Sequence, residues 1–445
     1  MSNVRVIYFL LAILVLSACK KDDDFYNLSN VEIAKTYSSE VVVDWYELIK
    51  TLTKETPGFT PPVAARAFGY IGIALYEGVS IGLPNKTSLS GKLNGLQYTI
   101  QTEDLEMYHW PAVANAILNQ TTLYFYSNTS DERMEAIMDL NNEYTSKYQL
   151  ELVPEVFEAS QVLAKEVADN IIEWSETDGG MNGQFNNFPT DYILPLTASW
   201  KPTAPDFSGP LQPYWGTNRP FLLANVDAVQ PVAPPIASTD ENSLCYERAT
   251  EVYNVVNNIT SEQIKIAEFW SDDPVTTATP PGHSIAIANQ LIVENNSNLG
   301  EATEIFAKLG IAISDAFISC WKTKYETLYV RPITYINENI DPNWEPILST
   351  PPFPEYTSGH SVQSGALAEV MISFFGENYA FVDRTHEGRT DIDGTPRAYD
   401  SFIDMAEEAA VSRLYGGIHY QEAIYLGLEQ GYAIGRNVSN LDLDN

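Results

Sequence analysis

Three short stretches in the last third of the chain carry residue types that together could hold a tetrahedral oxyanion. They are Lys324-x6-Arg331-Pro332, Thr357-Ser358-Gly359-His360 and Ser412-Arg413-x5-His419. A phosphate-like dianion needs cationic donors around its equatorial oxygens, a hydroxyl, a backbone N–H where a side chain would crowd, and imidazoles along the axis of displacement. The two arginines, the lysine, the serine, the glycine and the two histidines match these needs.

The charge of the whole chain makes this cluster of cations unusual. The sequence has 25 Lys and Arg against 59 Asp and Glu, which gives a formal net charge of −34. Three cations that converge on one site would therefore be a local exception on an acidic protein. The same charge argues against nucleic acid as a partner, because an anionic backbone would be repelled and no basic stripe with interleaved aromatics occurs.

The first 18 residues have the pattern of a signal peptide. Arg5 precedes an apolar run over residues 6–16 that is too short to span a membrane. Small residues before Cys19 resemble a bacterial lipobox, so we expect a lipid anchor on Cys19 and a polar tether over residues 19–30. This predicts a protein held in the bacterial envelope, at the outer membrane or cell surface; ordinary secretion or a periplasmic location is the alternative.

Only two further cysteines occur, Cys245 and Cys320, which argues against a disulfide framework and against a zinc cluster. They could pair with each other in an oxidising compartment. Because Cys320 falls on an apolar helical stripe, a buried free thiol is the preferred interpretation.

Helical periodicity dominates the chain, and strand-like alternation is scarce. We expect an N-terminal helical half at residues 31–178, an irregular wrapping loop at 179–239 and a C-terminal helical half at 240–445 that carries the oxyanion site. The loop is rich in proline and contains Trp200, Tyr214 and Trp215, which need cover from the rest of the protein. Besides the stripe described next, the expected helices are Val41–Thr53, Pro62–Val79, Trp110–Tyr126, Asp131–Lys147, Val153–Thr177, Ser261–Trp270, His283–Asn295, Val362–Phe375, Ser401–Tyr415 and Gln421–Arg436.

One apolar stripe places a candidate ligand in the core without any motif. Spacings of three and four from Ile305 to Trp321 make a continuous face, and Lys324 continues it four residues after Cys320. A core-facing lysine is costly unless an anion meets it. If this helix reached Val330 and stopped at Pro332, Lys324 and Arg331 would lie on one side of it.

Each motif also has an ordinary structural interpretation. A lysine and an arginine before a proline can simply mark a helix end, and Ser358 can be a helix N-cap. A lone histidine at the Gly416-Gly417 turn is often a solvated or capping residue. These interpretations do not explain why His360 and His419, two of only five histidines, both fall in motifs with the other anion-binding types.

Taken in order, the three motifs resemble the vanadium-dependent haloperoxidase and type-2 phosphatidic-acid phosphatase superfamily, whose pocket holds either vanadate or phosphate. The likeness is stronger to the soluble, chloroperoxidase-like members, in Trp321-x2-Lys324, in the run 352–360 and in the segment 412–420. Weaker likeness extends to residues 269–273, 280–283 and 64–67. Thr357 departs from the proline that is usual in the family, which we expect to loosen the turn.

The resemblance implies an all-α fold of two helical bundles and a set of residue roles. His419 would bind vanadium axially, and His360 would be the acid–base residue that handles the protons of peroxide. Phe353 and Trp321 would line the halide side, and Asp273 would orient Arg413, a role for which Asp272 competes. The equatorial oxygens would be bound by Lys324, Arg331, Ser358, Gly359 and Arg413.

Two activities follow from one such pocket. As a haloperoxidase, the protein would use hydrogen peroxide to oxidise a halide to a hypohalite-like species that modifies a small organic acceptor, and Lys324 would polarise the peroxide. As a phosphatase, His419 would form a phosphohistidine while His360 protonates the leaving oxygen. The haloperoxidase is preferred because no membrane helix is expected after Cys19 and because Phe353 and Trp321 fit that branch. A surface lipoprotein that binds an oxyanion without turnover is the third alternative.

Overall fold

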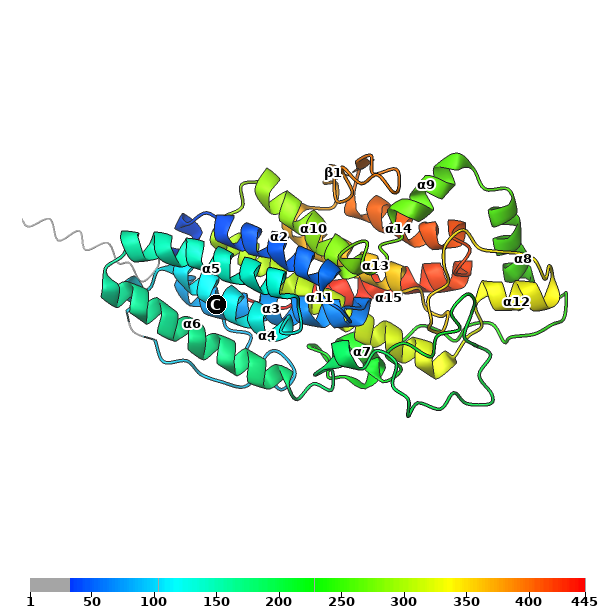
Figure 1. Cartoon of the computed structure of the whole chain (residues 1–445), viewed down its shortest axis with the longest axis horizontal. Helices are drawn as coiled ribbons and strands as arrows, with labels where there is room; N and C mark the ends of the chain where they lie inside the picture. The colour runs from blue at the N-terminus through cyan, green and yellow to red at the C-terminus, as the bar shows by residue number, and fades with distance from the viewer. Residues whose placement is uncertain (1–32, 103, 228, 445) are drawn as a thin grey trace, which may run out of the picture.

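The protein is a helical molecule in which two groups of helices share one long central helix (Figure 1). The computed structural model describes residues 33–102, 104–227 and 229–444. The expected signal peptide, the tether and Cys19 lie outside these residues. The all-α expectation is confirmed, with one small antiparallel ribbon of β1 (Phe381–Asp383) and β2 (Arg397–Tyr399) added to it.

The first group of helices gathers around α4, which contacts α3, α5 and α6, while α2 packs on α4 and α10. Proline at the first turn starts α3 and α6, where its missing N–H costs nothing. Ser130 caps α5 by accepting from the Arg133 amide. The helices of this group are α2 (Glu40–Glu55), α3 (Pro61–Val79), α4 (Trp110–Phe125), α5 (Asp131–Glu151) and α6 (Pro154–Ser175).

The second group gathers around α13, which contacts α11, α14 and α15. Asn298 and Glu301 form a capping box that starts α11, and Leu328 ends it in a left-handed conformation. The helices that follow the wrapping segment are α8 (Leu244–Asn257), α9 (Ser261–Phe269), α10 (Thr279–Glu294), α11 (Leu299–Thr327), α12 (Pro332–Asn339), α13 (Gly359–Phe375), α14 (Phe402–Tyr415) and α15 (Gln421–Ser439).

Helix α11 joins the two groups because it packs on α3 as well as on α13. Small residues allow the crossing with α3. A Cβ at Gly72 would lie 2.5 Å from the Phe306 carbonyl oxygen, and a Cβ at Gly310 would lie 2.7 Å from that of Phe68. Both separations are too short for a side chain, so the two backbones approach as closely as they do only because glycine stands at these positions.

The segment 179–239 wraps the molecule as irregular chain with only short helical turns, including α7 (Ala224–Asp227). Backbone bonds tie it to the site-bearing region, from the Trp200 amide to the Leu328 carbonyl (2.8 Å) and from the Leu211 amide to the Pro352 carbonyl (2.9 Å). Trp200 and Trp215 are buried, as their need for cover predicted, but the same expectation is wrong for Tyr214, which is exposed. Whether the chain divides into independent units at 178 and 240 stays a prediction.

Two details of the helix assignment were wrong. Helix α11 ends at Thr327, so Lys324 and Arg331 do not share a helix, and Pro332 starts α12 instead of stopping α11. Arg331 is the extended residue before α12, and this conformation turns its side chain back toward the site. The sequence analysis also omitted two helices: the eight-residue α12, and α8, a 14-residue helix whose buried face is formed by Cys245, Ala249, Val252 and Val256.

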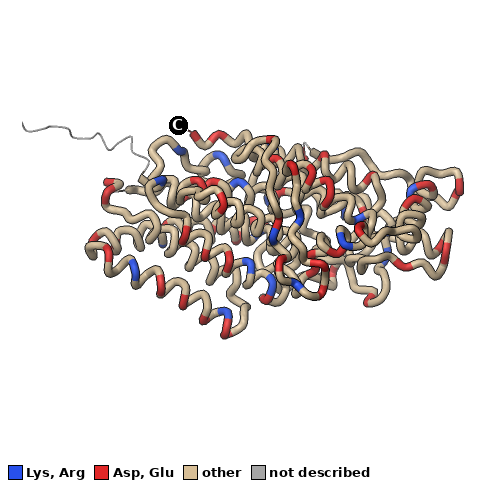
Figure 2. The backbone as a smooth tube through the Cα atoms, turned by 90° about the horizontal axis from the view of Figure 1, so that it is seen from above, with Lys and Arg blue, Asp and Glu red and all other residues tan. Residues whose placement is uncertain are grey.

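Acidic residues outnumber basic ones in the chain and are spread along the described backbone (Figure 2). Among the described residues, no helix combines the length and the apolar character needed to cross a membrane. Cys245 and Cys320 are both buried free thiols, which confirms the preferred interpretation of these cysteines.

Candidate active site

A cavity of about 370 Å³ lies where α11, the start of α13 and the turn after α14 meet the wrapping segment. Phe188 and residues 203–206 of that segment form part of its wall. The candidate residues on its surface are Trp321, Phe353, Gly359, His360, Arg413 and His419, together with Asp272 and Asp273. Lys324, Arg331 and Ser358 are fully buried directly behind this surface.

Lys324 is held by backbone oxygens. Its ammonium donates to the carbonyls of Pro354 and Glu355, both at 3.0 Å, and to that of Thr357. Burial, and then the charge of Arg331, lowers the pKa of Lys324 to about 7. The prediction that Lys324 faces the core is therefore confirmed, but the expectation that only an anion could satisfy it is wrong. The same three bonds fix the segment that leads into α13.

Arg331 reaches the site from the start of α12. Its Nε donates to the Phe353 carbonyl (2.9 Å), and its Nη1 donates to the Ile418 carbonyl (2.8 Å) and lies 3.2 Å from His419 Nε2. Its Nη2 is buried without a hydrogen-bond partner among the described residues. A buried guanidinium N–H without an acceptor is costly, so this atom is suited to an anion in the cavity.

His419 is oriented by a carboxylate that the sequence analysis missed. Its Nδ1 lies 2.8 Å from Oε1 of Glu355, which also accepts from the Tyr420 amide at 3.0 Å. A proton on Nδ1 leaves the lone pair of Nε2 directed toward Arg331. Burial, and then the charges of Arg331 and Lys324, lowers the pKa of His419 well below its ordinary value, so the imidazole is neutral.

Glu355 is itself fully buried, and burial raises its pKa to about 7 against the opposing effect of Arg331 and Lys324. Its only sequence signal was its position: it is the one acidic residue between the Pro351-Pro352 pair and Ser358. A single acid inside a proline-rich approach to a histidine motif is a weak signal, and the contact itself depends on the fold.

His360 and Arg413 complete the polar part of the cavity. His360 is partly buried on the first turn of α13, and its Nε2 has no hydrogen-bond partner among the described residues. Burial and the charge of Arg413 lower the pKa of His360 well below its ordinary value. Arg413 donates to the Ser412 hydroxyl (2.9 Å) and the Ala267 carbonyl (3.1 Å).

Asp272 and Asp273 both lie near Arg413. Burial lowers the pKa of Arg413, and the negative charge of each aspartate opposes that lowering. Asp272 is committed elsewhere, because its carboxylate lies 2.9 Å from the Nδ1 atom of His283. Asp273 lines the cavity. Burial raises the pKa of Asp273, and the positive charge of Arg413 opposes this rise. The role of Asp273 as the residue that orients Arg413 stays a prediction.

The turn that starts α13 is firmly held. Ser358 is the N-cap, and its hydroxyl accepts from the Ser361 amide at 3.3 Å. Gly359 lies at the first position of α13, with Trp321 as its nearest neighbouring side chain at 3.7 Å from an added Cβ. Thr357 is fully buried, and its hydroxyl donates to Gln430 at 2.8 Å, so it anchors the turn instead of loosening it.

Trp321 and Phe353 form an aromatic wall. Their ring centroids are 5.0 Å apart, and the Lys324 ammonium and the Arg331 guanidinium both lie 5.0 Å from the centroid of the Phe353 ring. The structure thus brings together the residues that the three motifs nominated, with cations behind an apolar wall.

Comparison with known proteins identifies the family. The chain is 35% identical to a bacterial vanadium-dependent iodoperoxidase of known crystal structure, with a TM-score of 0.82, over 92% of this chain and 98% of that chain. This chain belongs to the vanadium-dependent haloperoxidases. Residues 337–443 match the family model of the VCPO second helical-bundle domain. A vanadium chloroperoxidase from Curvularia inaequalis is 20% identical, over 88% of this chain and 80% of its own length.

A bacterial vanadium-dependent chloroperoxidase in its holo form shares the fold of this haloperoxidase, with a TM-score of 0.63 and 15% identity over 87% of this chain and 95% of that chain. The expected superfamily is therefore confirmed.

Proposed function

We propose that the protein is a vanadate-dependent haloperoxidase that oxidises a halide, iodide first among the candidates, with hydrogen peroxide. The observation that carries the proposal is the pair formed by His419 and Arg331. His419 has its Nδ1 fixed on Glu355, so its Nε2 can accept from Arg331 Nη1 at 3.2 Å, and the Nη2 of the same guanidinium is buried without an acceptor among the described residues. The likeness to an iodoperoxidase supports the choice of iodide.

Vanadate fits these residues. Arg331 and Arg413 would bind its oxygens through guanidinium donors, Ser358 and Gly359 through a hydroxyl and an N–H at the start of α13, and His419 Nε2 would be the metal ligand. Lys324 would join them by exchanging one of its carbonyl partners. When bound, vanadate supplies a Lewis acid that activates peroxide without a change of oxidation state. Phosphate can occupy the same site.

The protein's own residues would then handle the proton and exclude water. The lowered pKa of His360 keeps it neutral, and its Nε2 has no partner within the described part of the chain, so this atom can take a proton from the incoming peroxide and return it later. Trp321 and Phe353 would keep the halide side apolar, which strengthens the attraction of the cations for anions. Phe188 and the segment 203–206 would meet the small organic acceptor at the mouth of the cavity.

The test is to load metal-free protein with orthovanadate and follow peroxide-dependent oxidation of iodide, bromide and chloride. We expect oxidation only after loading, with iodide fastest, and its loss in His419→Ala. The matched control is His109→Asn, a buried histidine at the start of α4 whose capping role asparagine can fill. No vanadate-stimulated oxidation in the wild type, or full activity in His419→Ala, would refute the proposal.

A phosphate-ester assay of the vanadate-free protein separates the two other candidates. Ester hydrolysis that exceeds halide oxidation, and that is lost in His419→Ala, would favour the phosphatase with a phosphohistidine. Vanadate binding without either reaction would favour a non-catalytic oxyanion-binding lipoprotein.

We further propose that a lipid on Cys19 anchors the protein in the bacterial envelope, at the outer membrane or cell surface. Metabolic labelling with a fatty acid should label the wild type and not Cys19→Ala. Release of unlabelled wild-type protein into the medium or periplasm would favour ordinary secretion instead.

A further inference from the structure

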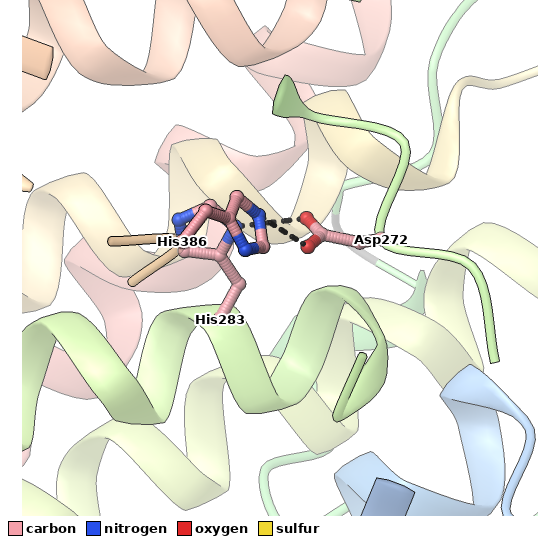
Figure 3. A group of neighbouring side chains, drawn as sticks. All are labelled: Asp272, His283 and His386. Atoms are coloured by element: carbon pink, nitrogen blue, oxygen red, sulfur yellow. Dashed lines mark hydrogen bonds and ion pairs between the residues drawn. The ribbon is translucent and has the colours of Figure 1, made fainter. Parts of the chain in front are cut away.

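A second group of potential ligands lies beside the site cavity. Asp272 follows the end of α9, His283 lies on α10 and His386 lies in the loop after β1, and their side chains meet in the interior (Figure 3). The Asp272 carboxylate lies 2.9 Å from His283 Nδ1 and 3.2 Å from His386 Nε2 through its two different oxygens. The ligand atoms of the three residues all lie within 4.8 Å of one another, and all three residues are buried.

Two atoms of this group lack the hydrogen bonds that burial demands. Asp272 Oδ1 and His386 Nε2 are close together, yet neither has a hydrogen-bond partner among the described residues. The two atoms are near enough for a bond but not aligned for one, and leaving both buried is costly. A cation would satisfy both, because it takes a lone pair from each and needs no hydrogen between them.

The three ligand atoms are close enough to gather around one small ion. Zinc bonds of about 2.0 to 2.1 Å to nitrogen and oxygen place neighbouring ligand atoms roughly 3.3 Å apart in a tetrahedron. The separations of 2.9 and 3.2 Å end on the two different oxygens of Asp272, and the three ligand atoms lie within 4.8 Å of one another, so the side chains would draw together around the ion to reach that spacing. Two imidazoles and one carboxylate favour Zn²⁺ over Ca²⁺ or Mg²⁺, which prefer oxygen ligands.

A fourth residue supplies the support that metal-binding histidines usually have. His283 Nε2 lies 2.7 Å from Asp383 Oδ2, and the other Asp383 oxygen accepts from the Thr385 amide at 2.8 Å. A carboxylate on the far nitrogen fixes the tautomer that leaves Nδ1 free for a metal. Trp270 stacks on the His283 ring with centroids 4.5 Å apart and covers that side of the site.

We propose that Asp272, His283 and His386 bind one Zn²⁺ ion, with Asp383 as the positioning residue of His283. A second cavity of about 620 Å³, lined by all three ligands, gives access to the fourth coordination position. Because Asp272 also lines the site cavity, the ion clamps the end of α9, α10 and the β1–β2 loop together next to Asp273. The competing arrangement is an imidazolium at His283 that donates to both carboxylates without a metal.

Calorimetric titration of tag-free, EDTA-treated protein with ZnCl₂ tests the proposal, with Co²⁺ as a spectroscopic replacement. We expect one Zn²⁺ per chain and the visible spectrum of tetrahedral cobalt without a thiolate band, which separates this site from the cysteines. Asp383→Asn should weaken Zn²⁺ binding by about 10- to 100-fold. His386→Gln should weaken it at least as much, while His109→Asn should bind Zn²⁺ like the wild type.

Two outcomes would overturn the proposal. One is the absence of stoichiometric Zn²⁺ binding to the wild type, which would leave the imidazolium arrangement. The other is binding that both Asp383→Asn and His386→Gln leave unchanged, which would place the ion elsewhere. If His386→Gln fails to fold by circular dichroism, Asp383→Asn and the cobalt spectrum still decide the question.

Discussion

Replacement of Glu355 by glutamine should separate two effects of its carboxylate: the buried charge lowers the stability of the fold, and the same charge strengthens His419 as a ligand for vanadate. Burial raises the pKa of Glu355 from 4.5 in the unfolded chain to about 7 in the folded protein. A raised carboxyl pKa stabilises the fold fully below pH 4.5, and that stabilisation is lost as the pH rises through 7. The shift corresponds to about 3 kcal/mol, because one pKa unit is worth about 1.4 kcal/mol.

Glu355→Gln removes this titration but keeps an oxygen for His419 Nδ1 and for the Tyr420 amide. Between pH 5 and pH 8, the free energy of unfolding of the variant should therefore rise by about 2 to 3 kcal/mol relative to that of the wild type. Urea unfolding of the vanadate-free proteins at both pH values measures the difference. A pH-independent cost of burying the glutamine amide does not affect this comparison, because the free energy of unfolding of each protein at pH 8 is compared with its own value at pH 5.

The same substitution should weaken vanadate binding. A carboxylate on the far nitrogen makes a ligand histidine a better donor, and losing such a partner typically costs about 10- to 100-fold in metal affinity. Equilibrium dialysis with vanadium analysis measures it. Glu77→Gln is the matched control, since burial raises the pKa of Glu77 too but its partners Ser88 and Leu89 lie far from the site. Unchanged vanadate affinity and unchanged pH dependence in Glu355→Gln would refute the reasoning.

Three further predictions follow from other contacts. Burial lowers the pKa of Lys324 from 10.5 to about 7, so the free energy of unfolding of the wild type should rise as the pH rises from 7 to 10.5. Lys324→Met should lack that rise when its unfolding in urea is followed over the same pH range. The substitution should also reduce the rate of halide oxidation by a larger factor than it reduces the affinity for vanadate. Inorganic phosphate should compete with vanadate, raising its apparent Kd in dialysis in proportion to phosphate concentration, unless the two anions use different pockets. Asp315→Asn should lower the free energy of unfolding, measured in urea, by about 2 to 3 kcal/mol. The Asp315 carboxylate accepts from the Phe221 and Leu222 amides and from Asn225, and an asparagine would face one of these donors with its own N–H group. An unchanged urea midpoint would contradict this prediction.

The sequence predicted the helices well where a long apolar stripe or a strong cap marks them. The stripe from Ile305 to Trp321 is the clearest case, and Lys324 lies in the core where the periodicity placed it. The route of the chain between Lys324 and Arg331 was not predictable from periodicity, because Leu328 ends the helix in a left-handed conformation that few non-glycine residues adopt. Proline in turn is compatible with both the end and the start of a helix.

The candidate site was predictable as a set of residue types and not as a set of contacts. Motif spacing nominated His360 and His419, whereas Glu355 and His386 could be found only from the fold. Contacts between residues 64 positions apart, such as Glu355 with His419, depend on how α13, α14 and α15 pack. Sequence patterns along one helix carry no information on such packing.

The glycine-lined crossing of α3 and α11 has a consequence for how the site responds to its ligand. Lys324 lies 14 residues beyond Gly310 on the same helix, which corresponds to about 21 Å along the helix axis. A long, buried helix packed on α3 couples the two ends of the crossing, so an anion that immobilises Lys324 should slow hydrogen exchange in α3, which supplies none of the candidate vanadate ligands. The N-terminal helices would then set the rigidity of the pocket, and with it the time that an oxyanion stays bound.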